Sequence, residues 1–150
     1  YGYDARLADE FQVPVPEPGV LDPKGAGASD FTRVQSPTFD LAPGHFVLGR
    51  TIEYFRLPPD VLALCLGKSS YARCGILINA TPFEPGWEGY ATLSIANLGT
   101  RPVRLYAREG IAQVLFFQSD EPCEVSYADR RGKYQAQRDV TLSRIETGVD

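Results

Sequence analysis

The chain has 150 residues, 43% of them hydrophobic, and a formal net charge of −4. A chain of this size and composition can form one domain with a buried core, and it lacks the apolar run of about 18 residues that a membrane-spanning helix requires. The acidic total argues against a nucleic-acid polymer as partner, because phosphate backbones select proteins with a strongly basic face.

Cysteine and histidine are scarce and scattered. Cys65, Cys74 and Cys123 are widely spaced and form no CxxC pair, which is typical of reduced cytosolic thiols, and we expect all three to be buried and inert. His45 is the only histidine, and no HxE is followed by PCxxC, so a zinc-dependent nucleobase deaminase has no ligands here. The sequence therefore predicts a cytoplasmic protein without zinc and without a metal bound directly by its side chains.

Prolines and glycines interrupt short segments rich in Val, Ile, Leu, Phe and Tyr, which predicts an all-β fold. Residues 13–30 are too rich in Pro and Gly for regular structure and are predicted to form a surface loop or an irregular edge. Strands are predicted over 46–50, 61–66, 76–79, 91–97, 103–106 and 111–117. Turns are predicted at 43–44, 58–60, 85–86, 98–100 and 109–110.

Two kinds of strand are expected. Segments 61–66 and 111–117 are apolar throughout, which favours strands covered on both faces, as in a sandwich or a jelly roll closed by subunit contacts. Segment 91–97 alternates instead. Its side chains are predicted to divide between one face with Ala91, Leu93, Ile95 and Asn97 and another with Thr92, Ser94 and Ala96.

A short turn of helix is predicted over 68–73, with serines available as N-caps. The backbone N–H groups of a helix start, together with Lys68, two serine hydroxyls and Arg73 one turn later, are suited to bind a phosphate. The stretch is not the GxxxxGK[ST] loop, however. A capped surface helix with solvated charges explains the same residues.

The turn over 81–89 places Glu84 and Glu88 on either side of Trp87, the only tryptophan. An aromatic ring beside a carboxylate can pack a sugar or base while the acid orients water. A solvated acid beside a core tryptophan accounts for the same pattern.

After residue 122 the chain has no proline, and the tail from Tyr127 to Arg144 is locally basic. Within it, residues 133–137 offer donors that could cover an anionic ligand. The alternative is an ordinary charged terminus.

Several segments, in the right order, together resemble bacterial dCTP deaminases: YGYDARLADEF, LDPK, RTIEYFRLP, LGKSSYARCGILINATPFEPGWEGYATL, EGIAQVLFF, CEVSYADRRGKYQAQ and VTLSRI. The match covers almost the whole chain. It implies a single nucleotide-binding domain over 1–150, a distorted jelly roll or β-barrel of the dUTPase-like type with one short helix, and a homotrimer with active sites between subunits. It also implies dCTP or dUTP as ligand with Mg²⁺ on its triphosphate, dTTP as regulator, and a segment before Tyr1 that this sequence does not contain.

The resemblance further implies roles for individual residues. Phosphate and catalytic-site donors would be Lys68, Ser69, Ser70 and Arg73. The pyrimidine would be read by backbone groups of Asn79, Ala80 and Thr81. Glu84 would contact the deoxyribose or, as in the triphosphatases, activate water, and Trp87 would pack near the sugar. The tail over the ligand would span residues 127–150, close over the triphosphate and contribute Tyr127, Lys133, Tyr134 and Gln137.

One position departs from the family. The deaminases have a pattern like TLEFSN where this chain has TLSIAN, so Ser94 stands at the position of the catalytic glutamate. Deamination without zinc needs a group that takes a proton from water and delivers protons to the ring and the departing amine, and an unactivated serine does this poorly. The sequence thus predicts a dCTP deaminase-like hydrolase of impaired or altered activity. It leaves open a dUTP or dCTP diphosphohydrolase that uses Glu84, and a catalytically silent trimeric nucleotide-binding protein.

Overall fold

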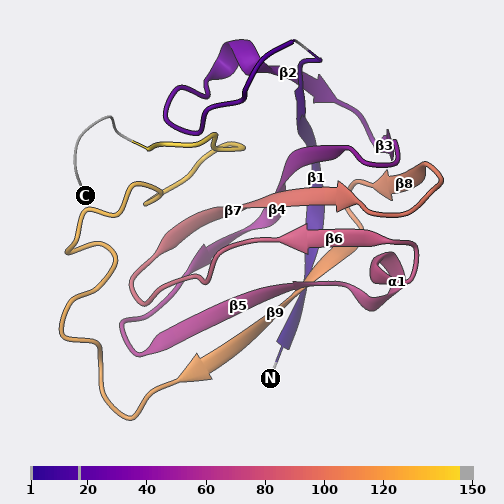
Figure 1. Cartoon of the computed structure of the whole chain (residues 1–150). Coiled ribbons are helices and arrows are strands. Elements are labelled where there is room, and N and C mark those ends of the chain that lie inside the picture. The colour runs from indigo at the N-terminus through magenta and orange to yellow at the C-terminus, as the bar shows by residue number, and fades with distance from the viewer. Residues whose placement is uncertain (1, 17, 146–150) are drawn as a thin grey trace.

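The computed structural model describes residues 2–16 and 18–145. Strands dominate these residues, and the one α-helix has four residues (Figure 1). The elements are β1 Gly2–Pro14, the 3-10 helix η1 Ala28–Asp30, β2 Phe31–Gln35, β3 Thr38–Leu41, β4 Phe46–Arg56, β5 Val61–Gly67, α1 Ser69–Ala72, β6 Ile76–Asn79, β7 Glu88–Asn97, β8 Val103–Tyr106 and β9 Gly110–Gln118. None of the helices in the described part of the chain is long and apolar enough to cross a membrane.

The long strand β1 joins two halves of the main sheet. Its beginning pairs with β9 and its end with β4 and β2, and the strand order is β5-β9-β1-β4-β7-β6. The two ends of this order, β5 and β6, contact each other, so the sheet curls into a barrel-like body (Figure 1). Strands β3 and β8 form a second, antiparallel sheet.

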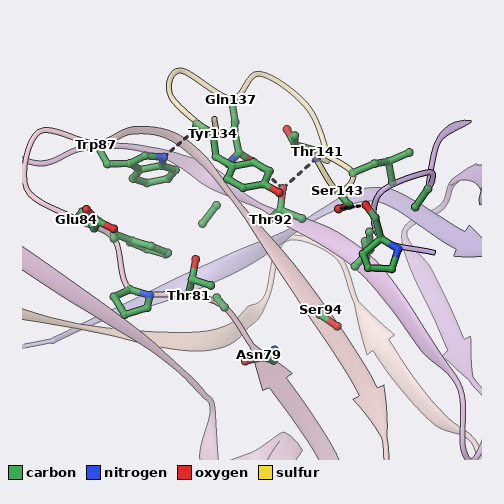
Figure 2. A pocket seen from close by; sticks show the side chains of 18 of the residues that line it. Asn79, Thr81, Glu84, Trp87, Thr92, Ser94, Tyr134, Gln137, Thr141 and Ser143 are labelled. Carbon is green, nitrogen blue, oxygen red and sulfur yellow. Dashed lines mark hydrogen bonds between the residues drawn. The ribbon is translucent and has the colours of Figure 1, made fainter. Parts of the chain in front are cut away.

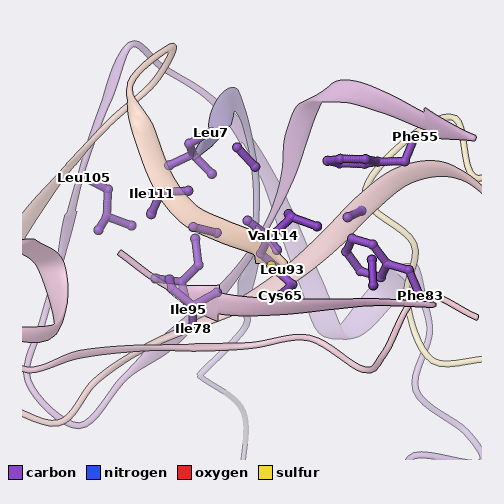
Figure 3. Close-up of a cluster of buried hydrophobic side chains, with 14 of the residues drawn as sticks. Leu7, Phe55, Cys65, Ile78, Phe83, Leu93, Ile95, Leu105, Ile111 and Val114 are labelled. Carbon is purple, nitrogen blue, oxygen red and sulfur yellow. The ribbon is translucent and has the colours of Figure 1, made fainter. Parts of the chain in front are cut away.

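The core lies inside this curled sheet, where apolar side chains of β1, β4, β5, β7 and β9 meet (Figure 3). The predicted alternation of β7 is confirmed, since residues 91, 93, 95 and 97 are buried while residues 92, 94 and 96 are only partly covered. Leu93 and Ile95 are fully buried. At about 25 cal/mol per Å² of apolar surface, burying two such side chains contributes on the order of 3–6 kcal/mol before entropy is counted.

Each strand predicted from the sequence is present. Those over 76–79 and 103–106 have the predicted bounds, and the other four are longer than predicted. Strands β1, β2 and β3 were not predicted, because polar residues interrupt their apolar pattern. In β1, Glu10 is buried and forms ion pairs with Arg33 and Arg50. These partners offset the cost of burying its charge, but they are distant in sequence, so the local hydrophobic pattern gives no sign of them.

Two boundaries differ from the prediction. The irregular segment predicted over 13–30 is narrower, because β1 runs to Pro14 and η1 covers Ala28–Asp30. The turn predicted at 109–110 lies at residues 107–108, where Arg108 adopts a positive φ of 67°. Strand β1 holds it there, since Arg108 N donates to Leu7 O (2.7 Å) and Leu7 N donates to Glu109 O (3.0 Å).

The three cysteines are free, but they are not all buried. Cys65 lies in the core, where burial raises the pKa of its thiol to about 11. Cys74 is exposed and Cys123 is half-buried, so the expectation of three buried thiols was wrong. Both lie outside the strands, in the turn after α1 and in the loop after β9, where little packs over them.

Asn97 ends β7 as a fully buried polar side chain. Its Nδ2 donates to Leu41 O (2.9 Å) and to Arg101 O (2.8 Å), and its Oδ1 accepts from Gly99 N (2.9 Å). One side chain therefore satisfies three backbone groups of the β7–β8 connection and the end of β3. Buried polar groups left unpaired are costly, so this amide fixes where β7 stops.

The Asn97→Asp variant should be less stable by about 3 kcal/mol, because an oxygen would replace the donor that faces two carbonyl groups in a buried site. Urea unfolding measures this difference. Asn79→Asp is the matched control, since Asn79 is exposed and its variant should unfold within about 0.5 kcal/mol of the parent. Equal midpoints for the two variants would contradict the assigned role of Asn97.

Candidate functional site

A cavity of about 630 Å³ opens along one face of β7. It is bounded by the loop after β6, the turn before β7, the loop between β1 and β2, and the C-terminal tail (Figure 2). Nine of the residues singled out from the sequence line it, namely Asn79, Ala80, Thr81, Glu84, Trp87, Ser94, Tyr127, Tyr134 and Gln137.

Strand β7 supplies the floor of the cavity. Because Leu93 and Ile95 face the core, Ser94 faces the opposite way and lines the cavity. The strand pairing sets its neighbours, with Leu48 of β4 on one side and Asn79 of β6 on the other. Ser94 therefore lies beside the last residue of β6, where the chain leaves the sheet.

The loop after β6 forms one wall. Its far end is fixed where Phe83 and Ala63 exchange backbone hydrogen bonds (2.8 and 2.9 Å), so residues 79–82 arch from β6 to β5. Asn79 and Thr81 are exposed, and Figure 2 shows both beside the cavity. This arrangement leaves backbone groups of the arch close to Ser94.

An aromatic cluster supports the next wall. Trp87 is buried, its ring lies 4.9 Å from that of Phe83, and its Nε1 donates to Tyr134 O (2.8 Å). Glu84 precedes it in the same turn and forms an ion pair with Arg130 of the tail. Among the described residues that line the cavity, Glu84 is the one carboxylate.

The tail runs beside the start of β7. Ala136 N donates to Glu88 O (2.8 Å), Tyr90 N donates to Gln137 O (3.1 Å), and residues 89 and 137 form a parallel bridge. Glycine is required at 89, because its φ is 150° and a Cβ there would lie 2.9 Å from Gln137 N. Trp87 and β7 thus hold the tail across the cavity.

Helix α1 lies elsewhere. Lys68, Ser69, Ser70 and Arg73 do not line the cavity, and neither does Lys133 of the tail. Lys68 Nζ lies 2.8 Å from Asp4 Oδ2, and the hydrogen bond from Lys68 lowers the pKa of that carboxyl. The expectation of a serine N-cap was wrong, because the helix starts at Ser69, Lys68 is its N-cap, and no side chain caps it.

Sequence reasoning missed several lining residues. Leu21 and Pro23 come from the segment between β1 and β2, and Phe31 is the first residue of β2. Leu48 comes from β4, and residues 141–143 come from the tail. Thr92 also lines the cavity, and the predicted alternation had already put it on the face of Ser94. The others carry no local signal, because strand register and the path of the tail bring them together. In the described part of the chain no cluster of His, Cys, Asp and Glu side chains could hold a metal.

The chain resembles known proteins in fold and in sequence. It superposes on a 2′-deoxycytidine 5′-triphosphate deaminase from Agrobacterium tumefaciens (TM-score 0.63, 22% identity, 79% of this chain and 39% of that one). It also superposes on the EIAV dUTPase (TM-score 0.51, 19% identity, 82% of this chain and 94% of that one). These structures define the class, an all-β barrel-like fold shared by dCTP deaminases and dUTPases.

Sequence similarity is more specific. A family model described as dCTP deaminase-like matches residues 1–119. A dCTP deaminase of Pseudomonas putida is 57% identical over 145 residues, which are 96% of this chain and 77% of that protein. The dCTP deaminase of Campylobacter hominis is 55% identical over 149 residues, 99% and 78% of the two chains. The chain belongs to the dCTP deaminase-like family.

Proposed function

We propose that this protein binds dCTP in the cavity along β7 and deaminates it to dUTP and ammonia, slowly, because Ser94 replaces an acid–base group. The observation that carries the proposal is that Ser94 shares one cavity with the arch at residues 79–82, with Trp87 and with the tail. Identity above 50% to proteins named dCTP deaminase supports the substrate.

In this proposal the pyrimidine lies against the backbone of Asn79, Ala80 and Thr81, where amide and carbonyl groups can read its polar edge. Trp87 and Glu84 flank the deoxyribose. The basic tail covers the triphosphate, with Tyr127, Tyr134 and Gln137 of the cavity lining nearest the ligand and Lys133 reaching the phosphates from outside that lining. Mg²⁺ would be carried on the phosphates, where it offsets their charge. The described part of the cavity lining provides a single carboxylate, and that carboxylate is already paired with Arg130.

The chemistry requires proton transfer at the base. Water adds at C4 and gives one of its protons to the ring nitrogen. The C4 hydroxyl then gives up the second proton to the amine, which leaves as ammonia while C4 becomes the carbonyl of dUTP. The Ser94 hydroxyl can position water but is a poor proton carrier near neutral pH, and loss of a positioned acid–base group costs on the order of 10²- to 10⁴-fold in rate. We therefore expect binding to persist while turnover is slow.

The proposed active unit is a homotrimer in the cytoplasm. Exposed apolar side chains on β5, β6 and β9 favour burial against another subunit, among them Leu62, Leu66, Leu77 and Phe117. Helix α1 lies outside the cavity of its own chain, so Ser69, Ser70 and Arg73 would act in the cavity of a neighbour. Three free cysteines are compatible with a reducing compartment.

Ser94→Glu should raise the rate of ammonia and dUTP release from dCTP with Mg²⁺ by on the order of 10²-fold or more, because a carboxyl group restores proton transfer at the base. A coupled ammonia assay and chromatography of the nucleotides measure both products. Thr100→Glu adds the same charge at an exposed bend outside the cavity and should leave the rate unchanged. Tight dCTP binding with no ammonia from either the parent or Ser94→Glu would sink the deaminase proposal and favour a silent nucleotide-binding protein.

A second candidate is hydrolysis of dUTP or dCTP to the monophosphate and pyrophosphate. It is favoured by Glu84, the one carboxylate in the described part of the cavity lining, which would orient water toward the α-phosphate. Arg130 is its ion-pair partner and would set its orientation.

If Glu84 has this role, Glu84→Gln should reduce pyrophosphate release on the order of 10²-fold or more, because the amide cannot accept a proton from water. Glu88→Gln is the control, since Glu88 lies in the same stretch but pairs with Arg56 outside the cavity. Pyrophosphate release that survives in Glu84→Gln would remove the residue from the mechanism.

A further inference from the structure

The hydroxyl group of Thr92 forms two hydrogen bonds with the C-terminal tail. Its Oγ1 donates to Gln137 Oε1 (2.9 Å) and accepts from Thr141 N (3.0 Å). Figure 2 shows this side chain beneath the tail, on the same strand as Ser94. A hydroxyl can donate and accept hydrogen bonds at the same time. The single oxygen of Thr92 therefore binds both Gln137 and Thr141 of the tail.

The tail segment that Thr92 holds is a partition between two cavities. Gln137, Thr141 and Ser143 line the cavity along β7, and they also line a second cavity of about 500 Å³ that is bordered by Arg138 and Arg144. Gln137 and Val140 are buried although they belong to an irregular tail. The position of residues 137–143 therefore decides the width and shape of both cavities.

Besides the hydrogen bonds of Thr92, the part of this partition beyond Gln137 contacts the rest of the domain through one further hydrogen bond, the cation–π contact of Arg138 with the Tyr54 ring (5.3 Å) and the packing of the buried Val140. The backbone bridge to β7 ends at Gln137. Beyond that residue, within the described tail, the hydrogen bonds to the rest of the domain are the one from Thr141 N to Thr92 and the one from Ser143 Oγ to Pro23 O (2.7 Å). The tail is thus hydrogen-bonded to β7 through Thr92 and to the loop between β1 and β2 through Pro23.

We propose that Thr92 is a positioning residue that fixes the tail as the wall of the cavity and thereby sets how tightly the nucleotide is held. The inference rests on the proposed function, because it takes dCTP as the ligand. It assigns to Thr92 a contact with the tail and not a role in the chemistry, since its hydroxyl donates its one proton to Gln137 and accepts from Thr141. A serine can replace it in this role, whereas a valine of the same shape cannot.

The test compares Thr92→Val with Thr92→Ser in the full chain. Thr92→Val loses both hydrogen bonds, so it should bind dCTP with Mg²⁺ about 10-fold more weakly by calorimetry, and trypsin should cut at Arg138 and Arg144 about 10-fold faster without nucleotide. Thr92→Ser should stay within about 2-fold of the parent in both measurements. Thr38→Val, at an exposed strand threonine outside both cavities, controls for the change of residue type.

Valine is well tolerated in strands, and a thermal melt of each variant confirms that the fold is kept. Equal trypsin resistance of Thr92→Val and the parent would overturn the anchoring role. Faster cutting with unchanged dCTP affinity would overturn the link to binding. A parent that binds no dCTP would instead defeat the proposed function, and the trypsin comparison, which needs no nucleotide, would still decide whether Thr92 anchors the tail.

Discussion

The two-residue repeat of β7 is the constraint on which the rest of the site depends. Leu93 and Ile95 must enter the core, so Thr92 and Ser94 are forced to the other face, where the cavity lies. A register shift of one residue would bury both hydroxyls and expose both apolar side chains. Pairing with β4 and β6 and the buried Asn97 amide prevent that shift.

The same strand organises the parts of the molecule that surround the cavity. Its first residues hold the tail through the bridge at Gly89, its middle anchors the tail through Thr92, and Ser94 lies beside the arch that follows β6. In the proposed function, binding and catalysis therefore rest on different residues of the cavity. The surfaces proposed to hold a nucleotide are retained, whereas the position proposed for proton transfer carries a hydroxyl.

The structural features that were predicted correctly from the sequence are those that follow from the local alternation of apolar and polar residues. The strand over 91–97 and the opposite directions of Leu93 and Ser94 follow from alternation alone, and the structure confirms both. Strand β1 was missed because its polar residues are compensated by distant partners, as Glu10 is by Arg50. The cavity contributions of Leu48 and Thr141 were missed because they arise from strand register and the path of the tail. The phosphate-binding role expected of Lys68 stays a prediction, and within this chain its ammonium group pairs with Asp4.

Hydrogen–deuterium exchange with and without dCTP and Mg²⁺ tests the central claim, that the nucleotide lies between β7, the arch and the tail. Backbone amides at residues 79–81 and at residues 134–143 should exchange more slowly with nucleotide bound, because the ligand and the closed tail suppress local opening. Sheet β3–β8 lies outside the cavity lining and should be unaffected. Nucleotide-dependent protection confined to that sheet, or none at the arch and the tail, would contradict the account.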